Sequence, residues 1–161
     1  MDNNNQTNRP YRKGVIAIVI DKNDSFLLIQ KNGYKDNEWN FLGGGREGNE
    51  TLEQNLFREL EEEIGSKKAE FEVIGISTHK IEYDYPPDTV MKIHGGKYRG
   101  QSYDQVILRF AGNKNGLIFS TQEFRGHKWV KANTLVKYLV FPNQYQNHKK
   151  AIDELLPGLI G

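Results

Sequence analysis

The stretch WNFLGGGREGNETLEQNLFRELEEEIGS, residues 39–66, decides the fold and joins a glycine-rich turn to a glutamate-rich helix. Asn49 is a residue type that caps helix N-termini, and Glu50 favours the first helical turn. Gly65 can supply the left-handed residue with which many helices end. These signals predict one helix of about four turns.

One face of this predicted helix is apolar and its border is acidic. The apolar stripe consists of Leu52, Leu56, Leu60 and Ile64, which recur every fourth residue, and Phe57 widens it. At about 100° per residue, Glu59 and Glu63 fall one turn apart at the border of the stripe. Glu62 lies on the adjoining polar side and Glu61 on the far side. We therefore expect Glu59, Glu62 and Glu63 to converge at the rim of the core.

Three converging glutamates are unfavourable unless a cation joins them. Like charges four residues apart on a helix cost about 0.2–0.5 kcal/mol per pair, and carboxylates in the last turns meet the negative end of the helix dipole. A divalent cation reverses both effects. Oxygen ligands without cysteine or clustered histidine favour Mg²⁺ or Mn²⁺ over zinc. The alternative interpretation of such a run is a solvated acidic helix face.

The glycines at 43–45 bear on that choice, because a turn without side chains lets a backbone carbonyl or amide reach a metal ion or a phosphate. The alternative is an ordinary loop between a strand and a helix. The glycines and the glutamates together favour a site that holds a metal ion.

Length and composition limit the class of protein. A chain of 161 residues predicts a single domain, here residues 11–161, after a disordered, asparagine-rich tail at 1–10. The net charge of +1 provides no global attraction for nucleic acid or membrane. The absence of cysteine excludes a disulfide scaffold and a thiolate zinc site. With no signal peptide and no apolar run of about 18 residues, we expect a cytoplasmic protein with no membrane partner.

The rest of the chain predicts an α+β domain. Predicted strands cover 14–20, 26–30, 69–79 with an irregularity at Gly75, 80–85, 105–111 and, within 123–130, the stretch GHKWV at 126–130. Predicted helices cover 133–138 and 147–156. The first two strands should form a hairpin. Residues 88–101 form a long loop with three cations, and loops of that length are usually functional or disordered.

Fixed spacings connect the glycine turn to the helix. The spaced positions are Gly44, Glu50, Arg58, Glu59, Leu60, Glu62, Glu63 and Gly65. This pattern resembles the signature of the Nudix hydrolase superfamily. Ser66 departs from it, because the family has an aliphatic residue there, and Leu42 stands where many members carry proline. The resemblance implies an α/β/α sandwich with a mixed sheet and one long catalytic helix.

Softer motifs resemble one branch of that superfamily, the bacterial RNA pyrophosphohydrolases and dinucleoside polyphosphate hydrolases. They are Tyr11-Arg12, Tyr83-Asp84-Tyr85-Pro86, GGKYRGQ at 95–101, and Glu123-Phe124-Arg125-Gly126 before Lys128-Trp129-Val130. Many members of the branch have Pro-Gln-Gly-Gly where this chain has Leu-Gly-Gly-Gly at 42–45. The triple glycine also resembles diphosphoinositol polyphosphate hydrolases of the same superfamily.

The resemblance implies a metal-dependent pyrophosphohydrolase that cleaves a phosphoanhydride bond, with Mg²⁺ or Mn²⁺ as cofactor. The expected substrate is 5′-triphosphorylated RNA or a dinucleoside polyphosphate. Alternatives are a nucleotide sugar, a nucleoside triphosphate or a diphosphoinositol polyphosphate as substrate, or a nucleotide-binding module without turnover. Intact Glu59, Glu62 and Glu63 favour an enzyme over a silent module.

The chemistry implied by the resemblance assigns roles to individual residues. Glu59 and Glu63 are the expected principal metal ligands, and a carbonyl of Gly44 or Gly43 can complete the shell. Glu62 is a further ligand or the general base. Glu123 is the other candidate for base or metal ligand, with surface solvation as its alternative. The sequence does not choose between Glu62 and Glu123 as base.

Other residues are assigned to support and substrate binding. Arg58 should lie away from the Glu59/Glu63 edge and, with Glu50, support the loop and helix. Candidates for the substrate phosphates are the cations Arg12, Lys31 and Arg99, together with Lys97. Phe141 is a candidate for stacking on a purine, with core packing as its alternative. The four histidines lack ligand spacing and receive no catalytic role. No feature of the sequence specifies an oligomeric state.

Overall fold

Seven strands form one mixed sheet in the computed structural model, which describes residues 4–161. They are β1 (Tyr11–Ile20), β2 (Ser25–Lys31), β3 (Leu42–Gly45), β4 (Phe71–Ile76), β5 (Ile81–Asp84), β6 (Gly100–Phe110) and β7 (Phe124–Lys131). The order is β4-β6-β1-β2-β7, with β3 on β1 and β5 on β6. The central pair, β1 and β6, is parallel along its length, and the other pairs are antiparallel.

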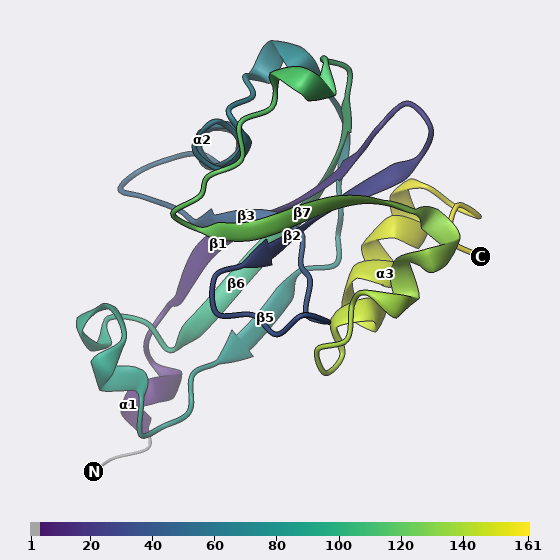
Figure 1. Ribbon diagram of the computed structural model, residues 1–161. Coiled ribbons are helices and arrows are strands. Elements are labelled where there is room, and N and C mark those ends of the chain that lie inside the picture. The colour runs from purple at the N-terminus through teal and green to yellow at the C-terminus, as the bar shows by residue number, and fades with distance from the viewer. Residues whose placement is uncertain (1–3) are drawn as a thin grey trace.

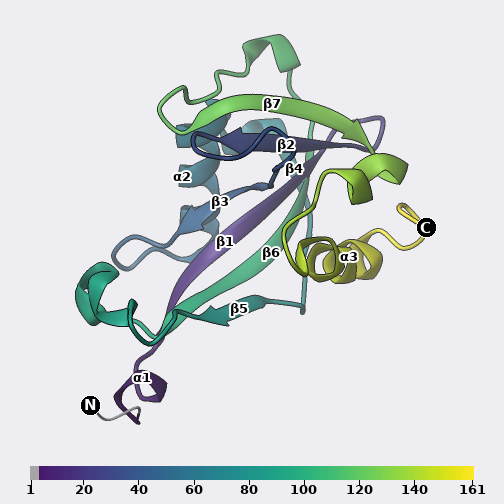
Figure 2. The same ribbon diagram turned by 60° about the horizontal axis from the view of Figure 1, so that its bottom comes forward.

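Two helices cover opposite faces of this sheet, α2 (Leu52–Ile64) on one side and α3 (Gln144–Leu155) on the other (Figures 1 and 2). A hydrophobic core lies on each face of the sheet, and alternate residues of β1 point into the two cores. Val15, Ala17 and Val19 pack with α2, and Ile18 and Ile20 pack with α3. A strand that is buried on both faces needs an unbroken apolar run, which is what β1 has. The α/β/α sandwich implied by the sequence is confirmed.

The remaining helical segments are short. They are α1 (Asn4–Thr7), η1 (Lys68–Glu70), η2 (Val90–Lys92), η3 (His94–Gly96), η4 (Lys114–Gly116) and η5 (Ala132–Lys137). The helix predicted at 133–138 is therefore the 3₁₀ helix η5, and α3 begins three residues before its predicted start. The hairpin of β1 and β2 and the irregularity at Gly75 in β4 are confirmed.

The N-terminal part of the chain contacts the long loop. Of the predicted tail, residues 1–3 lie outside the described residues, and α1 follows directly. Arg9 Nη2 donates to Met91 Sδ at 3.3 Å, and Arg99 N donates to the carbonyl of Pro10 at 3.0 Å. The loop predicted at 88–101 contains η2 and η3, and its last two residues begin β6. Among residues 4–161, no helix has both the length and the apolarity needed to cross a bilayer.

The start of α2 differs from the prediction. Thr51, not Asn49, is the N-cap: its Oγ1 accepts from Gln54 N at 3.2 Å, and Gln54 Oε1 accepts from Thr51 N at 2.9 Å. This reciprocal capping box satisfies two amide groups that the first turn leaves free. Glu50 consequently lies before the helix. The predicted end is confirmed, because Gly65 adopts the left-handed conformation with φ 67°.

The glycines predicted to form a turn belong to a strand. In β3, Gly43 and Gly44 pair with Ile16 and Val15 of β1. A Cβ atom on Gly43 would lie 2.2 Å from the carbonyl oxygen of Val15, so this close pairing requires glycine. The turn prediction was wrong because glycine usually weakens strands, whereas here the approach of two backbones excludes any side chain.

Candidate active site

Helix α2 carries a buried polar stripe beside its apolar one. Asn55, Glu59 and Glu63 recur every fourth residue, and all three side chains are buried against the backbone of β3. Asn55 Nδ2 donates to the carbonyl of Gly45 at 3.3 Å and more weakly to that of Gly44 at 3.4 Å. The two glutamates were predicted from the sequence and Asn55 was not, although the same spacing of four could have identified it.

Glu63 is the most deeply buried carboxylate of the site, with 3% of the residue exposed. Its Oε1 accepts a long hydrogen bond from Gly43 N at 3.3 Å. Burial raises the pKa of Glu63, and the hydrogen bond and charge of neighbouring Glu59 raise it further, followed by the charge of Glu123. A proton is therefore retained at this position, and a divalent cation would displace it.

Glu59 lies directly against a glycine. A Cβ atom built on Gly44 would lie 2.3 Å from Glu59 Oε1, so any side chain at position 44 would displace this carboxylate. Two buried carboxylates and an adjacent backbone strand form a donor set made of oxygen atoms, which suits Mg²⁺ or Mn²⁺. The residues present therefore fit a hard divalent cation.

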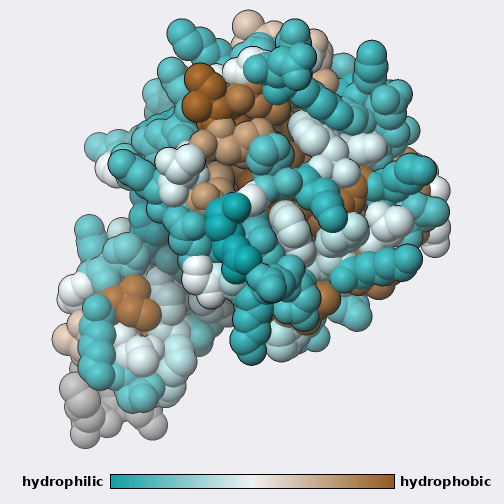
Figure 3. Space-filling view, in the orientation of Figure 1, coloured by the Kyte–Doolittle hydropathy of each residue, from teal (hydrophilic) through white to brown (hydrophobic). Residues whose placement is uncertain are grey.

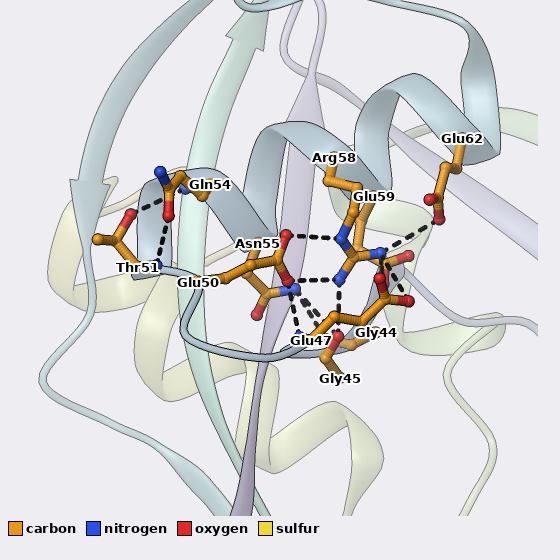
Figure 4. A network of polar contacts seen from close by, with 10 residues as sticks. All are labelled: Gly44, Gly45, Glu47, Glu50, Thr51, Gln54, Asn55, Arg58, Glu59 and Glu62. Atoms are coloured by element: carbon orange, nitrogen blue, oxygen red, sulfur yellow. Dashed lines mark hydrogen bonds and ion pairs between the residues drawn. The ribbon is translucent and has the colours of Figure 1, made fainter.

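Arg58 organises the loop before the helix (Figure 4). Its Nε and Nη2 donate to the two carboxylate oxygens of Glu50 at 2.7 and 2.9 Å, and Nη2 also donates to the carbonyl of Gly45 at 2.9 Å. These contacts raise the pKa of Arg58 and lower that of Glu50. The supporting role predicted for both residues agrees with this geometry.

The expectation that Arg58 lies away from the metal edge was wrong. Its Nη1 donates to Glu59 Oε1 at 3.0 Å and to Glu62 Oε2 at 3.2 Å. The side chain is long enough to bridge the adjacent residue and the residue one turn further along the helix.

Glu62 does not join the buried pair. Its side chain is 54% exposed and turns to Arg58. Among residues 4–161, no three carboxylate or imidazole side chains meet in a geometry that could hold a metal ion. The predicted convergence of three glutamates was therefore wrong for this arrangement, in which Glu59 and Glu63 alone meet. Glu62 pairs instead with the guanidinium group of Arg58, one turn earlier on the helix.

Glu123 reaches the site through the segment that leads into β7. That segment crosses the end of α2, where Ile118 N donates to the carbonyl of Ile64 at 3.0 Å and Ser120 N donates to that of Glu63 at 2.9 Å. Apolar side chains gather on the surface in the region of this crossing (Figure 3), and Ile118 is strongly exposed. The Glu123 side chain is exposed and forms no ion pair within residues 4–161.

A cleft of about 790 Å³ opens on the other side of β3. The backbone of Gly43 and Gly44 forms one wall, and residues 141–148 at the start of α3 form another. Figure 2 shows β3 between the two helices. The two glycines therefore contact the carboxylates on one side and line the cleft on the other.

The predicted substrate residues fall in three places. Lys31 and Phe141 line the cleft, where Phe141 meets the ring of Tyr34 edge to face at 5.3 Å. Arg12 lies across Gly45, where its guanidinium occupies the space that a Cβ atom would need. Arg99 is not among the residues that line the cleft, and its guanidinium group donates to both carboxylate oxygens of Asp84 at 3.1 and 2.9 Å. Lys97 is exposed near Tyr98.

The comparison with protein families agrees with this geometry. The family model of the NUDIX domain matches residues 10–155, and the chain belongs to that family. An RNA pyrophosphohydrolase of Zymomonas mobilis is 32% identical over 135 residues, which cover 83% of this chain and 87% of that protein. An RNA pyrophosphohydrolase of Pelagibacter ubique is 31% identical over 156 residues, covering 94% and 98%.

The fold is also that of solved structures. The binary complex of a C. elegans Ap4A hydrolase superposes with a TM-score of 0.66 at 18% identity, covering 86% of this chain and 93% of that one. At this identity the likeness concerns the fold alone. Nudix hydrolases in general depend on divalent metal ions, which agrees with the oxygen donors of α2.

Proposed function

We propose that this protein is a metal-dependent pyrophosphohydrolase that cleaves a phosphoanhydride bond of 5′-triphosphorylated RNA, with Mg²⁺ or Mn²⁺ as cofactor. The main supporting observation is the pair Glu59 and Glu63, two buried carboxylates that lie against the backbone of Gly43 and Gly44 beside an open cleft. The RNA substrate is supported by relatives that bear the name RNA pyrophosphohydrolase. We place the activity in the cytoplasm.

The metal site of this proposal uses Glu59, Glu63 and a carbonyl of Gly44. A bound divalent cation would neutralise phosphate charge and lower the pKa of a coordinated water. Glu63 must give up its proton for this, and Glu59 must share the oxygen that now accepts from Arg58. Glu62, whose side chain is 54% exposed, is a further candidate ligand in this proposal.

The proton of the attacking water needs a carboxylate acceptor, for which we choose Glu123 over Glu62. Glu62 is an ion-pair partner of Arg58. Glu123 has no such partner within residues 4–161, yet it lies close enough for its charge to raise the pKa of Glu63. A base must be free to accept a proton near the reacting atoms, and Glu123 meets that requirement better. The Glu123→Gln variant should lose more activity than Glu62→Gln.

Substrate positioning in this proposal uses residues beside β3 and in the cleft. Arg12 lies across Gly45, and its side chain forms no hydrogen bond or ion pair within the described part of the chain, so it can meet phosphate oxygens. Lys31 lines the cleft and can do the same. Phe141 and Tyr34 present aromatic surface on which a base can stack. Arg99 is held by Asp84 and has no role in this proposal.

A substrate panel tests the proposal. Triphosphorylated RNA, diadenosine tetraphosphate, a nucleoside triphosphate, a nucleotide sugar and a diphosphoinositol polyphosphate are compared for release of phosphate or pyrophosphate, with Mg²⁺, with Mn²⁺ and with a chelator. Metal-dependent turnover of triphosphorylated RNA with the highest kcat/KM is expected. Preference for another member would replace the substrate, and nucleotide binding without turnover of any member would identify a non-catalytic module.

Matched variants of one helix test the assignment of the metal ligands. Glu63→Gln should reduce kcat by a factor of at least about 100, because a metal ligand is lost. Glu61→Gln removes an exposed carboxylate on the opposite side of α2 and should leave kcat unchanged. Equal activities of the two variants would contradict the metal assignment.

A further inference from the structure

The cleft contains a buried histidine that the proposed chemistry does not use. His148 on α3 lines the cleft with only 3% of the residue exposed. Its ring packs edge to face against Phe41 at 4.9 Å, which fixes the plane of the imidazole. The sequence analysis gave His148 no role, because histidines scattered along the chain did not indicate which of them the fold would bring to the cleft.

The amide of Gln105 determines the hydrogen-bonding state of this ring. Gln105 is fully buried on β6, and its Nε2 lies between two carbonyl oxygens, those of His79 at 2.9 Å and Asn147 at 3.3 Å. Only the amino end of an amide can donate to both carbonyls, so the amide orientation is fixed. The other end, Oε1, therefore faces His148 Nδ1 at 2.8 Å as an acceptor.

An acceptor at that distance requires a proton on His148 Nδ1. A neutral imidazole with Nδ1–H carries a lone pair on Nε2. Burial lowers the pKa of His148 to about 4, which keeps the ring neutral at physiological pH. The hydrogen bonds of Gln105 thus keep the proton on Nδ1, and Nε2 of His148 is a hydrogen-bond acceptor.

This acceptor is open to a ligand. Nε2 has no hydrogen-bond partner within residues 4–161. In that part of the chain, the side-chain nitrogen and oxygen atoms that are both fully enclosed and unpartnered belong to Arg46, Asn55 and Gln101, so Nε2 of His148 is not sealed off. Because His148 lines the cleft, a ligand bound there lies beside this residue.

We propose that His148 is a specificity residue whose Nε2 accepts a hydrogen bond from an amino group of a purine base bound in the cleft. The identification of the ligand as a nucleotide rests on the proposed function. The cleft volume of about 790 Å³ lies in the range of small-molecule sites, and Phe141 and Tyr34 supply aromatic surface on the same wall. A base without the amino group would leave the buried acceptor without a partner, which costs binding free energy. Such a site therefore discriminates strongly between bases with and without the amino group.

Two pairs of nucleotides test this proposal, because the members of each pair differ in one amino group. They are AMP with purine riboside monophosphate, and GMP with IMP. Their Kd values for the full chain are measured by calorimetry with Mg²⁺ present. In at least one pair, the nucleotide with the amino group should bind at least about tenfold more tightly. Equal Kd values within both pairs, or binding of none of the four, would overturn the proposal.

Variants separate recognition from a structural role. His148→Phe should remove the discrimination within the pair, whereas His148→Gln, which retains an acceptor, should restore part of it. His79→Gln changes an exposed side chain and keeps the backbone carbonyl that holds Gln105, so it should leave the ratio of Kd values unchanged. Discrimination that persists in His148→Phe would overturn the assignment even if all variants fold.

Nitrogen NMR of the unmodified protein provides a measurement that does not depend on variant folding. The ¹⁵N shifts of His148 should show a protonated Nδ1 and an unprotonated Nε2, and the preferred nucleotide should shift the Nε2 signal. A proton on Nε2 in the free protein would overturn the proposal. Since binding is measured without turnover, absence of RNA hydrolysis would refute the proposed function and leave this result intact.

Discussion

Replacement of Glu63 by glutamine should make the metal-free protein more stable and should abolish its stabilisation by Mg²⁺ or Mn²⁺. The raised pKa of Glu63 is the reason. A folded-state pKa above the unfolded value means that the folded protein binds more protons, so stability falls as pH rises above the unfolded pKa. Glutamine cannot ionise, yet its Oε1 can still accept from Gly43 N.

The size of both effects can be worked from the site. One unit of pKa difference corresponds to about 1.4 kcal/mol, so removal of this ionisable group should raise the free energy of unfolding by roughly 1–3 kcal/mol in mildly alkaline buffer. A cation at 100 times its Kd stabilises the wild-type protein by about 2.7 kcal/mol, which corresponds to about 5–11 °C in Tm for a chain of this size. The variant should gain almost none of that.

Thermal unfolding measures both effects in one experiment. The wild type, Glu63→Gln and the exposed control Glu61→Gln are melted with chelator and with excess Mg²⁺ or Mn²⁺, in mildly acidic and in mildly alkaline buffer. The advantage of Glu63→Gln in chelator should shrink toward acidic pH, because Glu63 of the unfolded wild-type chain takes up its proton as the pH approaches the ordinary carboxyl pKa of 4.5. A full metal-induced shift in Glu63→Gln, or its loss in Glu61→Gln, would refute the reasoning.

Three further substitutions test particular contacts. Arg58→Ala leaves Glu50 without its partner and should lower the free energy of unfolding, measured in urea, by about 1–3 kcal/mol. As a control, breaking the more exposed ion pair of Lys149 and Asp153 should lower it by less than about 1 kcal/mol. Gly44→Ala should weaken Mg²⁺ binding at least about tenfold, because the new Cβ displaces Glu59; Gly116→Ala, which adds a methyl group in open space, is the calorimetric control. Thr51→Ala should cost about 1 kcal/mol through loss of the cap, and Asn49→Ala should change urea unfolding by less than half of that.

The fold was predictable because its determinants are local or periodic. The apolar run of β1 and the stripe of α2 specify which surfaces are buried, and both predictions were confirmed. The cap at Thr51 was missed because Asn49 is an equally good capping residue in sequence, and the choice depends on the Gln54 side chain three residues later. The strand β3 was missed because its glycines acquire their role only when β1 lies beside them.

The residues of the site likewise divide into those predictable from local spacing and those that only the fold brings together. Glu59 and Glu63 follow from helical spacing, so the sequence specified their shared edge. Residues far apart in the chain meet only through the sheet, and no periodicity relates His148 to Gln105. Arg99 shows the same limit, since the sequence gives a cation in a long loop, and only the fold shows Asp84 beside it.

The contacts of Arg58 explain how Glu59 and Glu62 could turn to a metal ion while the loop before the helix keeps its conformation. Its Nε and Nη2 hold Glu50 and the carbonyl of Gly45, and both groups belong to the segment before the helix. Its Nη1 alone reaches Glu59 and the exposed Glu62. A cation that takes up these two carboxylates therefore competes with one nitrogen of the guanidinium group, while the other two keep the loop in place. Lysine, which has a single nitrogen, could not serve both sides, so Arg58→Lys should weaken metal binding and loop stability together.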